Sequence, residues 1–460
     1  MNIIVPLIII IILFIGVFLF RNPRSAKLAN SIAAFSMLLA VIYIFMNNTF
    51  EKEYLIIFSI ITGTLLGYIA AIMVDMTMVP AMVAFQHGMG GIAAFIVAYI
   101  ELVSSIENIH SYEYSAGVIS IIIGAATFSG SIVASLKLSG KIKQTPTLLK
   151  NHNLLLLANL IISIIIGIAA IYLPLSIFFV GILLLILTSI LLGMLFSIRI
   201  GGADMPVLIS FLNATAGLAA SFCGIILGNS LLIVFGATVA ASGSVLTYVM
   251  CKAMNRNLLN IFISHNIKIG HQSSPTTLER INHSRNSEDN LEEKVVEILK
   301  NAKNIVIIPG YGMALSHAQF EVKQLADILT EMGKDVNFAI HPVAGRMPGH
   351  MNVLLAEADV PYDKLFEMDA INDAFPNVDA TIIVGACDVV NPAAVETEGT
   401  PISGMPILKA HESKNILIFN FDDRPGYSGV ENPLYRNDKC LKVFGDAKTS
   451  LQKILKHLNI

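Results

Sequence analysis

Two stretches of the sequence each carry one polar residue in an otherwise apolar setting. "PAMVAFQHGMGGIAA" (residues 80–94) and "PVLISFLNATAGLAA" (residues 206–220) align without a gap, and His87 and Asn213 occupy equivalent places in them. An imidazole titrates near physiological pH and can relay protons, and a carboxamide can orient a water molecule or accept a hydrogen bond. The pair therefore predicts a proton path, with hydrogen-bonded packing between helices as the alternative.

Asp204 lies nine residues before Asn213, in "GGADMP", which is about 13 Å along a helix. It stands directly before the apolar segment, so its carboxylate can cap the first turn of a helix that holds Pro206. A carboxylate at the mouth of a proton path can also pass protons on. The sequence leaves both roles open.

The stretch "PGYGMAL" (residues 309–315) follows an apolar strand pattern and opens a predicted helix. Glycines there let the backbone approach a pyrophosphate, and a helix N-terminus favours the anion, so the stretch predicts dinucleotide binding. Two features depart from the ordinary Rossmann pattern: Leu315 replaces the third glycine, and the second strand runs into His341 instead of an acidic residue. A plain strand–turn–helix is the alternative reading.

Three more polar loops follow predicted strands. They are "HPVAGRMPGH" (residues 341–350), "GACDVVNPAA" (385–394) and "DDRPGYSGVENPLY" (422–435). Ligands of open α/β sheets bind outside the carboxyl ends of the strands, so these loops predict one nucleotide site.

The composition changes near residue 256. Overall, 14% of the residues are charged and 55% are apolar, which excludes an ordinary soluble protein. Residues 1–256 hold eleven Lys/Arg and seven Asp/Glu, whereas residues 257–460 hold nineteen and twenty-six. We predict a membrane domain over 1–256, a polar linker over 257–290 and an α/β doubly wound, Rossmann-like domain over 291–460. The four cysteines have no CxxC spacing, which indicates neither a zinc site nor a disulfide framework.

Apolar runs of membrane-spanning length predict about nine helices, at residues 3–20, 28–46, 54–73, 77–100, 115–136, 153–173, 175–197, 206–228 and 231–251. Ten Lys/Arg fall on alternate loops, and one falls on the other loops. Because basic residues concentrate on the cytoplasmic side, we predict an outside N-terminus and a cytoplasmic C-terminal domain. The first run lacks a basic n-region and a small-residue cleavage site, and we interpret it as a retained span.

The number of predicted spans gives the two copies of the repeat the same direction across the membrane, so the duplication is a parallel one. The predicted helix after each copy carries a second repeated motif, "GAATFSGS" (124–131) and "GATVAASGS" (236–244). Small residues at such spacing allow helices to pack closely in lipid.

The C-terminal pattern alternates helices and short apolar strands. Helices are predicted at 291–302, from 310 to 332 and at 446–458, and strands at 304–309, 335–341, 380–385, 415–420 and 441–444. This alternation predicts a parallel, doubly wound sheet.

These motifs, together with "IGGADMP", "YVMCKAMNR", "TPTLLKNHN" and "FGDAK", resemble the beta subunit of the proton-translocating NAD(P) transhydrogenases over nearly the whole chain. The resemblance implies hydride exchange between NAD(H) and NADP(H), coupled to proton movement. It implies that this chain binds NADP(H), that an alpha subunit binds NAD(H), and that alpha–beta units pair in an inner membrane. A secondary transporter regulated by a cytoplasmic dinucleotide-sensing domain is the alternative.

The resemblance also implies roles for individual residues. His87, Asn213, Asp204 and Asp388 would serve proton movement and its coupling to the nucleotide. The implied nucleotide contacts are Gly310, Tyr311, Gly312, Met313, Ala314, Val343, Ala344, Gly345, Arg346, Met347, Pro348, Gly385, Ala386, Cys387, Asp388, Val389, Gly404, Met405, Asn420, Phe421, Asp422, Asp423, Arg424, Pro425, Gly426, Tyr427, Asp446 and Ala447.

One loop departs from the family pattern. The family commonly carries a Lys-Arg-Ser run that holds the 2′-phosphate of NADP(H), and this chain has Asn420, Phe421 and Asp422 there. A carboxylate at this place suits the free 2′-hydroxyl of NAD. Arg424, two residues further on, is the available cation, and NADP(H) remains the predicted ligand.

Overall fold

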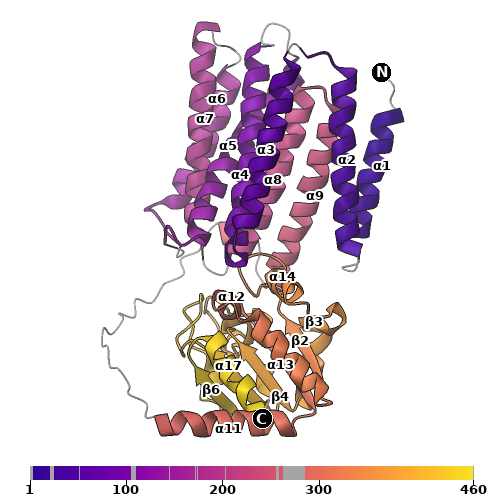
Figure 1. Cartoon of the computed structure of the whole chain (residues 1–460). Helices are drawn as coiled ribbons and strands as arrows, with labels where there is room; N and C mark the ends of the chain where they lie inside the picture. The colour runs from indigo at the N-terminus through magenta and orange to yellow at the C-terminus, as the bar shows by residue number, and fades with distance from the viewer. Residues whose placement is uncertain are drawn as a thin grey trace. The chain divides into compact units, whose positions relative to one another are not determined.

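A computed structural model describes residues 4–20, 25–50, 52–104, 110–143, 146–170, 172, 175–201, 204–254, 258–262 and 285–458. The chain forms two compact units. One comprises Met1–Arg199 and Leu208–Leu246, and the other comprises Ile200–Val207 and Thr247–Ile460 (Figure 1).

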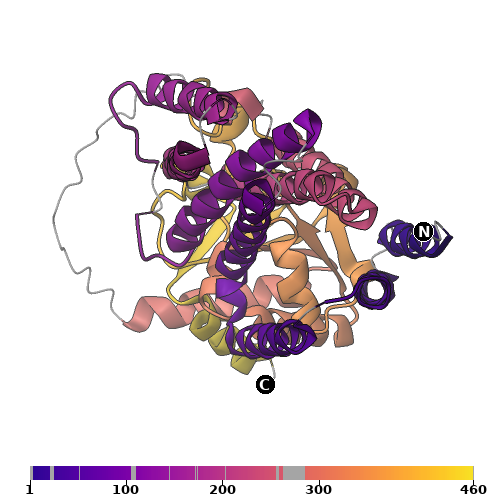
Figure 2. The same ribbon diagram turned by 90° about the horizontal axis from the view of Figure 1, so that it is seen from above.

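Long apolar helices make up the first part of the described chain, and Figure 2 views several of them end-on. They are α1 (Ile4–Leu19), α2 (Ala26–Asn47), α3 (Glu53–Met73), α4 (Val79–Ser104), α5 (Ser111–Leu138), α6 (His152–Ala170), α7 (Leu175–Ile198), α8 (Met205–Ile226) and α9 (Ser230–Ala253). Eight of these are long and apolar enough to span a membrane, and α1, with 16 residues, is shorter. The multi-pass helical architecture predicted from the sequence is confirmed.

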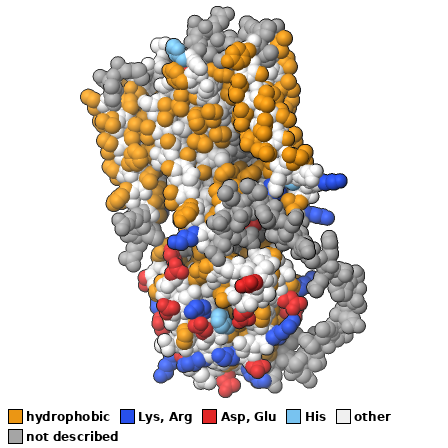
Figure 3. Space-filling view, turned by 180° about the vertical axis from the view of Figure 1, so that it is seen from behind, with side chains coloured by type: hydrophobic (Ala, Val, Ile, Leu, Met, Phe, Trp, Pro, Cys, Tyr) orange, Lys and Arg blue, Asp and Glu red, His pale blue; other side chains and the backbone are white. Residues whose placement is uncertain are grey.

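Apolar side chains cover the outside of the helices. On the face in Figure 3, hydrophobic side chains dominate the helices, whereas charged side chains are frequent on the α/β unit. None of the residues of α3 is buried. An apolar exterior of this kind is what a lipid environment requires.

The sequence repeat recurs as a repeated helix crossing. A Cβ atom added to Gly91 of α4 would lie 2.6 Å from the carbonyl oxygen of Gly124 in α5. A Cβ atom added to Gly217 of α8 would lie 2.8 Å from the carbonyl oxygen of Gly236 in α9. Within each helical hairpin, α4–α5 and α8–α9, the two helices thus cross at equivalent glycines. Their backbones are in contact there, so a side chain does not fit.

The two hairpins also pack against each other. The Thr127 hydroxyl of α5 donates to the Thr215 hydroxyl of α8 over 2.8 Å, and the Ser120 hydroxyl donates to the carbonyl oxygen of Ala219 over 3.0 Å. Ala94 of α4 packs with Ala219 and Cys223 of α8. Both copies of the repeat therefore contribute to one helix cluster.

Lys137 lies in the last turn of α5, one residue beyond the predicted span 115–136. It is buried, and its Nζ donates to the carbonyl oxygen of Ile198 over 2.5 Å. Ile198 ends α7, where the helix dipole favours a cation. The lysine therefore satisfies carbonyl groups that the end of α7 leaves without helical partners.

The second unit contains the predicted parallel sheet. Its strands are β1 (Asn304–Pro309), β2 (Asp335–Ile340), β3 (Leu365–Glu367), β4 (Ala380–Val384), β5 (Asn415–Asn420) and β6 (Cys440–Phe444). The order is β3-β2-β1-β4-β5-β6, and every pair is parallel. This is the doubly wound arrangement, with the reversal of strand order between β1 and β4.

Helices surround the sheet. They are α11 (Arg285–Asn301), α12 (Tyr311–Leu315), α13 (Gln319–Glu331), α14 (His350–Glu357), α15 (Met368–Ile371), α16 (Ala393–Glu396) and α17 (Ala447–Leu458). The short helix α10 (Leu258–Phe262) instead packs with Cys251 and Met254. α13 packs beside α17 on the face turned to the viewer in Figure 1, and α11 packs against α17 and β6.

Several predicted bounds differ from the structure. α11 begins six residues earlier than the predicted start at 291, and α10 lies inside the stretch predicted as a linker. The predicted helix from 310 to 332 is interrupted between α12 and α13, where His317 has φ 51°. β3 has no counterpart in the prediction. Of the predicted linker, residue 257 and residues 263–284 lie outside the described residues.

Candidate functional site

The turn after β1 lies against the loop after β4. The Gly312 amide donates to the carbonyl oxygen of Gly385 over 2.8 Å, and Gly385 has φ 66°. A Cβ atom on Gly310 would lie 2.3 Å from that oxygen, and one on Gly312 would lie 2.6 Å from the Gly385 Cα. These glycines are therefore required by contact between two loops of the protein itself.

The helix that this turn opens is short. α12 has five residues, so its dipole is weak compared with that of the long helix expected in a Rossmann motif. The turn places Tyr311 at the carboxyl edge of the sheet, where burial raises its pKa to about 12. The phenol is therefore neutral and can donate a hydrogen bond at physiological pH.

Arg346 joins the loop after β2 to the loop after β5. Its guanidinium carbon lies 4.1 Å from the ring centroid of Tyr311 and 5.2 Å from that of Tyr427. Its Nη2 also donates to the Tyr427 hydroxyl. Cation–π contacts and this hydrogen bond bring together three side chains that follow three different strands.

His350, which the sequence did not single out, supports this cluster. Its Nδ1 accepts a hydrogen bond from the Arg346 amide over 3.1 Å, so the neutral ring carries its proton on Nε2. Burial lowers the pKa of His350 to about 4, which keeps the ring neutral. The Nε2 atom is buried and has no hydrogen-bond partner in the part of the chain that the structure describes.

Asp388 lies after β4 and is bound by the loop after β5. Its Oδ2 accepts from the Ser428 amide over 3.1 Å, and its Oδ1 accepts from the Ser428 hydroxyl over 2.6 Å. Burial raises the pKa of Asp388, and the two hydrogen bonds from Ser428 oppose that rise. Ser428 is a second residue that sequence reasoning missed.

Asn420 and Tyr435 are buried next to the loops after β4 and β5. The Asn420 amide donates to the carbonyl oxygen of Ala386 over 2.9 Å and to the Tyr435 hydroxyl over 2.7 Å. Both residues are buried, and burial raises the pKa of Tyr435. Asn420 was predicted as a nucleotide contact, and in the structure it fixes the loops after β4 and β5.

The segment after Asn420 is exposed. Phe421 has 79% of its surface exposed. Asp422 accepts from the Arg424 amide over 3.0 Å, and its carboxylate lies 3.4 Å from the Arg424 Nε. Arg424, the cation of this stretch, is therefore paired with Asp422. Asp422 is the residue that stands in place of the serine of the Lys-Arg-Ser run.

Two further residues predicted to contact the nucleotide, Gly404 and Asp446, also lie in loops that follow strands. Gly404, with φ 74°, donates its amide to the carbonyl oxygen of Ala394 over 2.7 Å. Asp446 caps α17, because its Oδ1 accepts from the Thr449 amide over 3.0 Å.

His341 occupies the place of the acidic residue of ordinary Rossmann domains. Its Nε2 donates to the carbonyl oxygen of Pro406 over 2.8 Å, and its Nδ1 accepts from the Val343 amide over 3.2 Å. Burial lowers the pKa of His341 to about 4. With both ring nitrogens used within the protein, this histidine fixes loops at the edge of the sheet.

In the helical unit, His87 and Asn213 lie at equivalent places in the two hairpins. Each stands four residues before a crossing glycine, Gly91 or Gly217, and each is partly buried. Asp204 directly precedes α8 and is partly buried. His87 and Asn213 thus occupy equivalent positions relative to the two glycine crossings.

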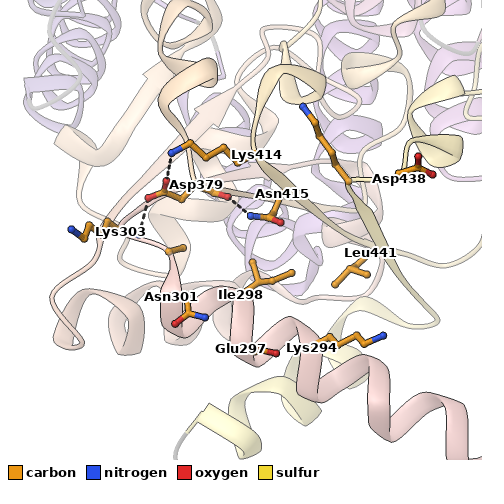
Figure 4. A pocket seen from close by; sticks show the side chains of 12 residues that line it. Lys294, Glu297, Ile298, Asn301, Lys303, Asp379, Lys414, Asn415, Asp438 and Leu441 are labelled. Atoms are coloured by element: carbon orange, nitrogen blue, oxygen red, sulfur yellow. Dashed lines mark hydrogen bonds and ion pairs between the residues drawn. The ribbon is translucent and has the colours of Figure 1, made fainter.

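A groove of about 760 Å³ lies at the opposite, amino-terminal edge of the sheet (Figure 4). Asp379 holds this edge together: it accepts from the Lys303 and Asn304 amides and from the Lys414 Nζ, the last over 2.8 Å. The predicted nucleotide contacts lie at the other ends of the strands.

Comparison with known proteins agrees with the motifs. The sequence model of the family described as NAD(P) transhydrogenase beta subunit matches residues 3–457. A protein named NAD(P) transhydrogenase subunit beta from Rhodospirillum rubrum is 37% identical over 446 residues, which cover 95% of this chain and 95% of the relative. A second protein of that name, from a specified strain of the same species, gives the same values.

Proposed function

Because this chain belongs to the family of NAD(P) transhydrogenase beta subunits, we propose that its α/β domain binds NADP(H) and that its helices carry protons. The proposed domains are 1–256 in the membrane, a linker over 257–290 and the nucleotide domain over 291–460. One observation carries the nucleotide assignment: Tyr311, Arg346, Asp388 and Tyr427 follow different strands and gather at the carboxyl edge of one parallel sheet.

The family couples hydride transfer between NAD(H) and NADP(H) to proton translocation, and the beta subunit works in a membrane with an alpha subunit. The family assignment therefore supports this function over a dinucleotide-sensing transporter. We assign NAD(H) to the alpha subunit, because the described residues of this chain form one dinucleotide-type sheet. A pair of alpha–beta units is the proposed assembly.

The residues at the sheet edge fit a dinucleotide. The Nε2–H of His350 is a buried donor without a partner among the described residues, and the Arg346 guanidinium acts electrostatically on the same ring. Both groups suit the oxygen atoms of a pyrophosphate. The bound nicotinamide supplies the hydride chemistry, and the residues of this chain bind it, orient it and exclude water.

We propose that the 2′-phosphate of NADP(H) is bound without the family's Lys-Arg-Ser run. Arg424 is the cation proposed to replace it, in competition with its present partner Asp422. Because both groups are exposed, exchanging this ion pair for one with a phosphate costs little.

We propose that His87 is the titrating group of the proton path and that Asn213 orients water beside it. Support comes from their equivalent places beside the two glycine crossings. Asp204, directly before α8, is the proposed link to the nucleotide domain. Hydride transfer and proton movement are then coupled if the protonation state of His87 or Asp204 biases the nucleotide domain between two states.

The proposed location is the inner membrane, with the N-terminus outside and the nucleotide domain in the cytoplasm. The distribution of Lys and Arg over alternate loops supports this orientation.

Reconstitution tests the function. The chain and its alpha subunit, placed together in sealed vesicles, should exchange hydride between NADPH and an NAD analogue while the lumen pH changes. Hydride exchange with a constant lumen pH in tight vesicles would contradict the proton path. Absence of NADPH binding to the full chain would contradict the nucleotide assignment.

A further inference from the structure

Asp388 is attached to the loop after β5 mainly through Ser428, and the backbone amide of Tyr427 acts on the carboxylate in the same direction. Both carboxylate oxygens accept hydrogen bonds from Ser428, one from the amide over 3.1 Å and one from the hydroxyl over 2.6 Å. A Cβ atom on Gly426 would lie 2.8 Å from Oδ2, so the carboxylate also lies directly against the loop backbone.

The hydrogen-bond direction of the Ser428 hydroxyl is fixed. Its Oγ accepts from the Val430 amide over 3.2 Å, which leaves its own hydrogen to point at Asp388. Because two donors point at the two carboxylate oxygens, the geometry favours the ionised carboxylate.

The surroundings of Asp388 act in the opposite direction. Burial raises its pKa, and its titratable neighbours are Cys387 on the same loop and Tyr435, neither of which supplies a positive charge. Arg346 binds the ring of Tyr427, the residue before Ser428. Hydrogen bonds from Ser428 are therefore the main compensation for the burial of this charge.

We propose that Ser428 is a positioning residue that keeps Asp388 ionised and thereby holds the segment from Gly426 to Val430 across the carboxyl ends of β4 and β5. The consequence for nucleotide binding rests on the proposed function. The hydrogen bonds themselves belong to the ligand-free protein, so the test begins there.

The direct test is the infrared titration of the Asp388 carboxyl in the full, purified chain without nucleotide. The band is identified by its loss in Asp388→Asn. Ser428→Ala should raise the titration midpoint by roughly one pH unit or more, the size expected for one hydrogen bond to a charged group. Ser428→Thr, which keeps the hydroxyl, should restore the original midpoint.

A second pair of variants separates the hydroxyl from packing. Ser428→Thr and Ser428→Val have nearly the same shape, and a midpoint that differs between them supports the proposal even if Ser428→Ala folds poorly. Amide exchange of residues 428–430 should be faster in Ser428→Val than in Ser428→Thr. Equal midpoints in wild type, Ser428→Ala and Ser428→Val would overturn the proposal.

Nucleotide binding provides the readout that depends on function. The pH profile of NADPH affinity should shift upward in Ser428→Ala, and Ser428→Ala should cause no further shift in an Asp388→Asn background. If the carboxyl midpoint moves but NADPH does not bind to any variant, the proposed function fails and the role of Ser428 stands. If NADPH binds and neither the carboxyl midpoint nor the profile moves, the role of Ser428 fails. If the midpoint moves and the profile does not, the role of Ser428 stands and its consequence for nucleotide binding fails.

Discussion

At the scale of single residues, the ion pair between Asp422 and Arg424 determines the selectivity that we expect for the nucleotide. A 2′-phosphate at this loop needs the Arg424 guanidinium and meets the Asp422 carboxylate, whereas a 2′-hydroxyl can donate to that carboxylate. Arg424→Ala should therefore weaken NADPH binding roughly tenfold and leave NADH binding nearly unchanged. Asp422→Ser should strengthen NADPH binding, because it removes a like charge.

The measurement is a competitive titration of the full chain with both nucleotides. Arg436→Ala is the matched control, since Arg436 is equally exposed and paired with an acidic residue, Glu431, at 2.7 Å. Tighter binding of NADH than of NADPH by the wild-type chain would refute the NADP(H) assignment.

The second prediction at this scale concerns the two polar residues of the repeat. His87→Ala should abolish proton movement and strongly slow coupled turnover, because the titrating group proposed for the interior of the path is lost. Asn213→Ala should have a milder effect of the same kind, since an amide orients water but does not titrate. Both variants should still bind NADPH.

Vesicles that contain the variant chain and the alpha subunit, followed by lumen pH, provide the measurement. Wild-type rates of proton movement in His87→Ala would assign this histidine to helix packing alone.

At the scale of helices, the stability of the two hairpins should depend on the glycines at the helix crossings. Gly91→Ala places a Cβ atom 2.6 Å from a backbone oxygen, so the helices must separate. We expect a loss of roughly 1–3 kcal/mol, the usual cost of overpacking. The matched control is Gly63→Ala in α3, where a Cβ atom has nothing within 4 Å. Thermal unfolding in detergent should separate the two variants, and equal stability would contradict the crossing.

The sequence predicted elements well where one local property decides them. The length of the apolar segments predicted α2 to α9. Short continuous apolar runs predicted β1, β4 and β5, because strands that are buried on both faces carry such runs. β3 escaped prediction because it is a three-residue edge strand without a fully buried residue. Local pattern has no signal for such a strand.

Within the site, residue identity could be predicted but contacts could not. The loops of Tyr311, Arg346 and Asp388 were located because each follows a recognisable strand. Gly310 and Gly312 have a further role that the sequence did not predict, since they are required by contact with the loop of Gly385, which is far away in the sequence. For the same reason no sequence signal identified Ser428 as the partner of Asp388.

At the scale of the whole molecule, we expect acid to destabilise the α/β domain through His341. Its pKa is about 4 in the fold and its usual value is 6.5. Between these values the unfolded chain binds more protons than the folded one, so stability rises with pH across this window and falls as pH is lowered through it. The change due to His341 is on the order of 2–3 kcal/mol. His341→Gln should remove this part of the slope and leave the part due to His350, whose pKa is also lowered to about 4.

Urea-dependent proteolysis of the full chain between pH 7 and pH 4.5, read from peptides of β1 and β4, measures this effect. His317, exposed between α12 and α13 with φ 51°, provides the control His317→Asn, which should keep the wild-type slope. A slope in His341→Gln equal to that of the wild type would exclude His341 as the source.

The last prediction concerns the path of the whole chain through the membrane. Asn48, after α2, and Ile142, after α5, are both exposed and are separated by three long apolar helices, α3, α4 and α5. If each of these helices spans the bilayer, the two positions lie on opposite faces. The basic residues assign Ile142 to the cytoplasm, so Asn48→Cys should react with an impermeant thiol reagent in intact cells, and Ile142→Cys should react only after permeabilisation.

The parent chain is the control: Cys223, Cys251 and Cys440 are buried, and its labelling reports any reaction of the partly exposed Cys387. Reaction of both variants from one face would show that one of the three helices does not cross, and reversed accessibility would place the nucleotide domain outside the cytoplasm, away from its proposed substrates.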